Sequence, residues 1–260
     1  MEEPLASQAF FNSRLLGAMF LHAGEKFHAT ASLFAENDAM KMSTDKLGNE
    51  AWGAMTRLVW HPFTERGKIF HIGISGAYES PRYSKNPANS HSSYTLRAPF
   101  PTRIANVSAQ EATITNATAL WKFSPEMNVA CGNLGLEVQY FYVGIKRDHA
   151  LPNYSAWGAY GNVRYLLNGQ GYTYTRTDAG IATPDPGSME LVAAYNYSTL
   201  SDKDAGIHGG KVSDWSLTFN YYLNKYMIWR VRGSITRATD NVAFNNNTFS
   251  ILETRLQIKF

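Results

Sequence analysis

Apolar and polar residues alternate along this chain in segments of about eight to fourteen residues, which turn-rich polar stretches separate. The last segment, ILETRLQIKF, has Leu252, Leu256, Ile258 and Phe260 on one side and Glu253, Arg255, Gln257 and Lys259 on the other, with Ile251 and Thr254 as exceptions. Because successive side chains of a β-strand point to opposite faces, this segment has one apolar face and one charged face. A soluble sandwich would bury the apolar face, whereas a transmembrane barrel would turn it toward lipid.

The alternation predicts about twelve strands in an all-β, antiparallel fold. The predicted strands are residues 14–22, 27–34, 52–61, 69–78, 94–97, 112–123, 134–146, 157–167, 191–199, 215–223, 227–236 and 248–260. Residues 1–10 can form a short helix. No apolar stretch approaches the roughly 18 residues that a helical membrane span requires, so the sequence excludes a helical membrane protein.

The connections between the predicted strands differ in length. Bacterial barrels have short turns at the periplasmic side and longer loops outside. Residues 23–26 and 223–225 are predicted as tight turns, and residues 36–49, 79–92, 201–213 and 238–247 as outer loops. A strict alternation of short turns and long loops needs one further strand at residues 103–107, which brings the count to about thirteen. The connection 168–188 remains an exception, because it is long but falls on the short-turn side. Since single-chain barrels close with an even number of strands, the odd count predicts further strands upstream of Met1.

Aromatic residues make up 13% of the chain and gather near the ends of several predicted strands. They include Trp52, Trp60, Trp157, Tyr165, Trp215 and Tyr221. This distribution is typical of the aromatic girdles at the two membrane interfaces of a barrel. The net charge of +3, without a block rich in Lys and Arg, argues against a nucleic-acid partner. We therefore favour a transmembrane β-barrel in contact with lipid over a soluble sandwich.

The basic residues of the polar faces are candidates for the lining of a pore. They are Arg57, Arg164, Arg230, Arg232, Arg255 and Lys259 opposite apolar stripes, with Arg97 and Arg103 beside the corner Pro99-Phe100-Pro101. The planar guanidinium group donates paired hydrogen bonds to phosphate-like anions and stays charged. A lumen lined by such groups favours anions over cations. The alternative is that these are wall arginines paired with Glu137, Glu253 and acids of the loops.

Residue patterns for catalysis or cofactor binding are weak. The seven histidines lack metal-ligand spacing, and Cys131, the one cysteine, cannot form a disulfide within the chain. The segment GISGA at residues 73–77, around Ser75, approaches a nucleophile elbow but lies within an alternating strand. Residues 168–171 lack the Lys-Ser or Lys-Thr ending of a phosphate loop. We predict neither an enzyme nor a metal or cofactor site.

Six short motifs, in order along nearly the whole chain, resemble the C-terminal part of the phosphate-selective porin O/P family of Gram-negative outer-membrane channels. They are MEEPLASQAF at residues 1–10, YTLR at 94–97 before the proline corner, GNVRYLLNG at 161–169, LVAAYNYS at 191–198, NYYLN at 220–224 and RLQIKF at 255–260. The resemblance implies a barrel of about 16 to 18 strands, usually a homotrimer, with a basic lumen that conducts phosphate or other anions. It also implies that residues 1–260 belong to one barrel domain that begins before Met1, and it places Arg97 in the family's short basic strand.

The residues and the resemblance together favour passive diffusion of small solutes across the bacterial outer membrane, with a preference for anions such as phosphate. Phe260 resembles the terminal signal that the outer-membrane insertion machinery recognises. The expected partners are outer-membrane lipid, small anions and further copies of the chain in a homotrimer or larger assembly. Three alternatives remain open: a non-conducting barrel subunit of a larger assembly, an outer-membrane enzyme, and a soluble or surface-bound all-β binding domain.

Overall fold

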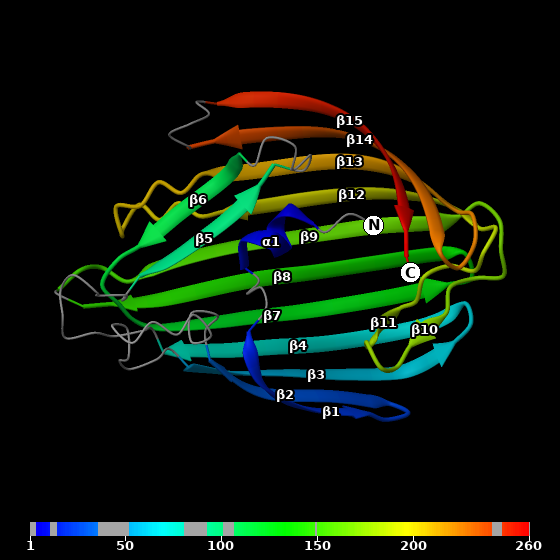
Figure 1. The fold of residues 1–260 in the computed structure, drawn as a ribbon, viewed down its shortest axis with the longest axis horizontal. Helices are drawn as coiled ribbons and strands as arrows, with labels where there is room; N and C mark the ends of the chain where they lie inside the picture. The colour runs from blue at the N-terminus through cyan, green and yellow to red at the C-terminus, as the bar shows by residue number, and fades with distance from the viewer. Residues whose placement is uncertain are drawn as a thin grey trace.

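The computed structural model describes residues 4–10, 15–35, 52–80, 93–100, 107–148, 150–240 and 246–259. An eleven-stranded sheet has the order β1-β2-β3-β4-β7-β8-β9-β12-β13-β14-β15 (Figure 1). These strands are β1 (Leu16–Ala23), β2 (Phe27–Ala35), β3 (Trp52–Glu65), β4 (Lys68–Ser80), β7 (Ala117–Cys131), β8 (Leu134–Arg147), β9 (Tyr154–Leu166), β12 (Met189–Thr199), β13 (Lys211–Tyr222), β14 (Met227–Thr239) and β15 (Asn247–Ile258). Every neighbouring pair is antiparallel. The prediction of an all-β, antiparallel fold is confirmed.

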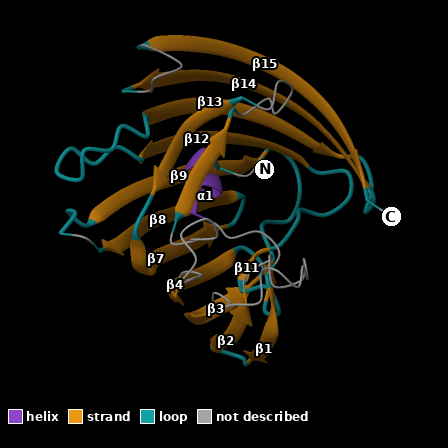
Figure 2. Cartoon of the chain, turned by 60° about the vertical axis from the view of Figure 1, so that its left-hand side comes forward, coloured by secondary structure: helices purple, strands orange, loops and turns teal. Residues whose placement is uncertain are grey.

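The sheet curves into a trough whose two edges are β1 and β15 (Figure 2). Because each of the eleven strands is antiparallel to its neighbours, the first and the last run in the same direction. Closure of this sheet into an antiparallel barrel therefore needs an odd number of further strands between the two edges. The described wall has eleven strands, fewer than the predicted count of about thirteen but likewise an odd number.

Three predicted strands differ from the wall strands that the structure shows. Asn116, which has a φ of 55°, divides the predicted strand 112–123 between β6 (Ser108–Ile114) and β7. β6 pairs with β5 (Tyr94–Pro99) in a separate hairpin, so residues 94–97 do not belong to the wall. Alternation predicts the two faces of a strand but not its partner, which is why the sequence did not separate this hairpin from the wall. Of the predicted strand 103–107, Val107 alone is described, and it lies outside the strands.

The two faces of the sheet have opposite polarity. On β14, Trp229 and Ile235 are exposed on the convex face, whereas Arg230 and Arg232 are buried on the concave face. Exposed apolar residues on the other wall strands include Leu58, Trp60, Ile72, Ile74, Trp121, Trp157, Val163, Leu217 and Leu252. Leu252 of β15 is the most exposed of them, at 82%. Soluble proteins bury most such side chains, so this convex surface suits the hydrocarbon core of a membrane.

A short helix and the β5–β6 hairpin lie on the concave side of the sheet (Figure 2). The helix α1 (Leu5–Phe10) packs against β5, β8, β9 and β12, which confirms the short helix expected in residues 1–10. Phe10 stacks on Phe141 of β8 with a distance of 5.7 Å between ring centroids. Apolar side chains of α1, the β5–β6 hairpin and the wall form one buried cluster. Within the described ranges, no helix is long and apolar enough to cross a membrane.

A second hairpin, formed by β10 (Tyr174–Thr175) and β11 (Gly180–Ile181), folds over the concave side. It belongs to the connection between β9 and β12, residues 168–188. This whole connection is called the inner hairpin. The backbone of Tyr172 is hydrogen-bonded to Gly67 and Gly132, which lie in the β3–β4 and β7–β8 turns. The long connection that breaks the alternation of short and long segments is therefore an inward-folded element fixed at the short-turn end.

Candidate pore wall

The structure places five of the eight predicted pore-lining residues on the concave face of the wall. They are Arg57 on β3, Arg164 on β9, Arg230 and Arg232 on β14, and Arg255 on β15. Lys259 follows β15, and its backbone N–H donates to the carbonyl of Tyr226. Arg97 lies on β5, within the trough rather than in its wall. Arg103, like the predicted assembly signal Phe260, lies outside the described residues.

The strand register brings four of these arginines into two adjacent cross-strand rows. One row runs through residues 164, 192, 218, 232 and 253, and the next through 166, 190, 220, 230 and 255. Arg230 and Arg255 are direct cross-strand partners in the second row. Since directly opposite side chains lie about 5 Å apart at Cβ, the two positive charges are neighbours on the concave face.

Arg232 is held between two carboxylates. Its Nη2 lies 2.8 Å from Asp214 Oδ2, and its Nη1 lies 3.2 Å from Glu253 Oε1. Thr236 Oγ1 donates to the second Asp214 oxygen at 2.6 Å. The Asp214 carboxylate is fully buried. This geometry ties β13, β14 and β15 together and neutralises Arg232 within the wall.

Glu190 of β12 is a fully buried carboxylate with four polar neighbours. Its Oε1 accepts a hydrogen bond of 2.8 Å from the Tyr172 hydroxyl. Its Oε2 accepts from Asn220 Nδ2 at 2.8 Å and from the Tyr222 hydroxyl at 2.7 Å. Burial, with Glu190 beside it, raises the pKa of the Tyr172 phenol above its usual range, so this hydroxyl stays a donor. Since Tyr172 belongs to the inner hairpin, Glu190 connects that hairpin to the wall.

The two arginines beside Glu190 have different partners. Arg164 Nε lies 3.5 Å from Glu190 Oε1, and its guanidinium lies 5.7 Å from the centroid of the Tyr172 ring. Arg230 Nε donates at 2.7 Å to Asn220 Oδ1, an uncharged amide oxygen. Arg164 is thus part of an ion pair, whereas Asn220 holds Arg230 through a neutral acceptor.

Arg57 lies on the opposite side of the trough and faces the inner hairpin. Its Nε forms a 2.7 Å ion pair with Glu126 Oε1 of β7. Its Nη1 and Nη2 donate to the carbonyls of Asp178 and Ala179, each at 2.9 Å. These contacts orient the guanidinium toward protein groups and hold the tip of the inner hairpin to β3.

A cavity of about 500 Å³ lies beside Arg57 on the concave side. Its lining combines charged, hydroxyl, amide and aromatic groups: Arg57, Glu79, Lys122, Glu126, Ser32, Ser75, Ser124, Gln139, Phe10, Phe34 and Phe141. Lys122 Nζ lies 3.4 Å from Glu79 Oε1, so both basic residues of this lining are paired with acids. Within the described residues, no group of His, Cys, Asp and Glu is arranged to hold a metal ion.

Arg97 also has an acidic partner, on the neighbouring strand of its hairpin. Its Nε lies 3.5 Å from Glu111 Oε2 on β6. Ser108 Oγ accepts a hydrogen bond from Arg97 Nε and donates one to Glu111. Both charged side chains are about half exposed, so the pair adds little stability.

Four of the predicted basic candidates therefore carry a carboxylate partner, and the sequence identified one of these partners. The partners are Glu126 for Arg57, Glu111 for Arg97, Glu190 for Arg164, and Asp214 with Glu253 for Arg232. Glu253 was expected in this role; Glu137, the other acid suggested, accepts a hydrogen bond from Tyr160. The alternation puts Asp214 and Glu190 on the same face as the arginines. Which acid pairs with which arginine depends on the register between strands, which alternation does not give.

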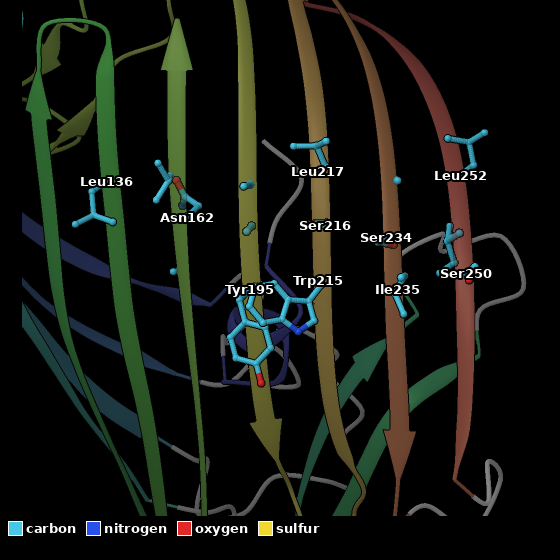
Figure 3. Close-up of a pocket in the computed structure, with 16 residues that line it drawn as sticks. Leu136, Asn162, Tyr195, Trp215, Ser216, Leu217, Ser234, Ile235, Ser250 and Leu252 are labelled. Carbon is cyan, nitrogen blue, oxygen red and sulfur yellow. The ribbon is translucent and has the colours of Figure 1, made fainter.

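The convex face has an apolar groove of about 920 Å³ across β8, β9 and β12 to β15. One cross-strand row of the groove combines large side chains with the small residues Ala193 and Gly233; it runs through Leu136, Val163, Ala193, Leu217, Gly233 and Leu252. Figure 3 shows the rings of Tyr195 and Trp215 beside each other at this groove, with 4.3 Å between their centroids. Because the groove faces away from the trough, it belongs to the apolar convex surface and not to the candidate pore wall.

Comparison with known families gives a match over the whole chain. The family model described as phosphate-selective porin O and P matches residues 1–260. No curated protein matches the chain.

Proposed function

We propose, from the fact that the chain belongs to the phosphate-selective porin O and P family, that it forms a passive diffusion channel for small solutes in the bacterial outer membrane. The polarity of the sheet supports this function, because its convex face is apolar and exposed, whereas its concave face has polar and charged side chains outside the cluster that packs against α1 and the β5–β6 hairpin. A channel needs that arrangement, with lipid outside and water inside.

The channel prefers small anions such as phosphate. The observation that carries this proposal is the cross-strand pair Arg230 and Arg255, with Lys259 beyond it at the short-turn end. Two guanidinium groups side by side on the concave face attract an anion that reaches them. The guanidinium forks also match the geometry of phosphate oxygens.

The experiment that tests this preference compares two charge-neutralising variants in planar bilayers. Arg255→Gln removes a charge from the concave face, whereas Arg237→Gln removes an exposed charge at an outward-facing position of β14. We expect the first variant to lower the anion-to-cation permeability ratio and the second to leave it unchanged. Equal ratios in both variants would assign selectivity to other residues.

We also propose that several copies of the chain assemble in the membrane as a homotrimer or a larger complex. The second candidate function is a non-conducting subunit of a larger assembly. It is favoured by the open sheet of the described residues, in which β1 and β15 are edges that do not pair with each other. Mass measurement of the native complex in mild detergent, together with its conductance, separates these two functions. A complex of the expected mass that conducts no ions would favour the non-conducting subunit.

A further inference from the structure

Three histidines lie at neighbouring positions of the wall beneath the inner hairpin. His28, His61 and His71 come from β2, β3 and β4, and their exposures are 2%, 0% and 0%. The register pairs His28 with Val59 and Val59 with Gly73. His61 and His71 are each two residues from these partners toward the short turns, so the three imidazoles share the concave face.

Each of these histidines contacts the inner hairpin. His28 Nδ1 lies 3.2 Å from the carbonyl oxygen of Arg176, and His71 Nδ1 lies 2.9 Å from the Tyr174 hydroxyl. The ring of His61 lies 5.1 Å from the Tyr174 ring, and both of its nitrogens are buried without a hydrogen-bond partner. A neutral imidazole tolerates this site, but an imidazolium has two N–H donors and a charge that burial penalises.

The groups that face the histidine cluster are mainly basic. Arg57 of β3 and Arg176 of the inner hairpin are the basic neighbours, and Tyr174 supplies the hydroxyl. Glu126 of β7 is the carboxylate that reaches the cluster, 3.3 Å from His71 Nε2, and it is already paired with Arg57. Protonation of the three histidines would therefore place three more positive charges around one occupied carboxylate.

We propose that His28, His61 and His71 form a pH-sensitive latch, which holds the inner hairpin against the wall at neutral pH and releases it in acid. Repulsion among the imidazolium groups, Arg57 and Arg176 drives the release, together with the two buried N–H donors of a protonated His61, which have no acceptor. The inner hairpin lies in the trough at the short-turn end, so its release widens that end of the channel. This part of the inference rests on the proposed channel function.

The position of the inner hairpin can be measured without ion conduction. A spin label on Thr177→Cys, in a Cys131→Ser background, reports the mobility of the exposed tip of the hairpin in the membrane-inserted protein. We expect the label to become mobile in acid, at a pH below the ordinary histidine value of about 6.5, because burial opposes the charge of an imidazolium. His61→Phe keeps a ring against Tyr174 and should suppress this change, whereas His22→Phe, at an exposed residue of β1, should not. A label with constant mobility, or an equal change in His61→Phe, would overturn the latch.

Conductance gives the second readout. The wild-type channel should conduct more in acid than at neutral pH. His61→Phe should bring the ratio of acid to neutral conductance closer to one. If His61→Phe fails to fold, His71→Gln takes its place, because an amide can still bond Tyr174 and Glu126 but does not titrate. Absence of conductance at every pH would contradict the channel function, while the spin label would still decide the latch.

Discussion

Arg232 of β14 and Asp214 of β13 form an ion pair on the concave face, with 2.8 Å between Nη2 and Oδ2 and both side chains buried. Arg232 is an arginine that the sequence predicts as a pore-lining cation, yet its charge is compensated within the wall. The pair therefore contributes to the strength of the sheet rather than to the selectivity of the lumen.

Arg232→Gln should lower the free energy of unfolding by about 3–5 kcal/mol, because it leaves the buried carboxylate of Asp214 without its cation. Denaturant unfolding of the protein in lipid vesicles measures this change. The double variant Arg232→Gln/Asp214→Asn should recover part of the loss, since it removes the unpaired charge. A single variant as stable as the wild type would show that the pair does not support the wall.

Tyr172→Phe should loosen the inner hairpin. The change deletes the hydroxyl that donates to Glu190 Oε1 at 2.8 Å and leaves a buried charged acceptor with one donor fewer, at a cost of about 1–3 kcal/mol. Hydrogen exchange of the amides in 168–188 measures the effect. Tyr226→Phe, at a half-exposed tyrosine, is the matched control and should exchange like the wild type. Equal protection in both variants would refute the connection through Glu190.

Gly171→Ala should disturb the junction of the inner hairpin with the two short turns. Gly171 has a φ of +93°, and a Cβ there would lie 3.0 Å from the Gly132 carbonyl oxygen and 3.2 Å from the Gly67 Cα. Both the backbone strain and the close contacts oppose a side chain, so we expect the free energy of unfolding to fall by about 1–3 kcal/mol. Gly180→Ala, in the same hairpin but with no atom within 4 Å of the added Cβ, should have a smaller effect on the melting temperature. Similar losses in the two variants would contradict this packing.

Asp240, just after β14, gives the connection to β15 an acid-sensitive contact. The hydrogen bond from His208 Nδ1, 3.0 Å from Asp240 Oδ1, holds the pKa of this carboxyl below its usual range, and Lys211 adds to the effect. A lowered pKa means that the contact stabilises the fold above the ordinary value of about 4 and is lost as the pH falls below it. The melting temperature of Asp240→Asn should therefore fall less on acidification than that of the wild type. Identical acid dependence would assign no role to Asp240.

Much of the wall could be predicted from the sequence, because the alternation of residues gives the two faces of a strand directly. The predicted strand 227–236 agrees with β14, and its arginines lie on the buried concave face. The strand partners could not be predicted in the same way. Residues 94–97 and 108–114 form an internal hairpin although they alternate like wall residues. The sequence contains no local signal that distinguishes a wall strand from a strand inside the trough.

The compensation of charge was also beyond the sequence. Arg164 and Glu190 lie on strands β9 and β12, which the inner hairpin separates in the chain, and the register between those strands brings them together. The alternation placed Arg164 on the face opposite the apolar stripe of its strand, and the turn pattern identified 168–188 as a long connection. It did not show that this connection folds inward, because turn length alone does not determine the path of a loop.

Anion preference is the central claim, and the reversal potential of the wild-type channel under a salt gradient tests it most directly. Two chambers with different concentrations of potassium chloride are separated by a planar bilayer that contains the protein. The basic pair Arg230 and Arg255 predicts a reversal potential shifted from zero toward the equilibrium potential of chloride. In Arg255→Gln this shift should be smaller. A reversal potential near the equilibrium potential of potassium would contradict the account.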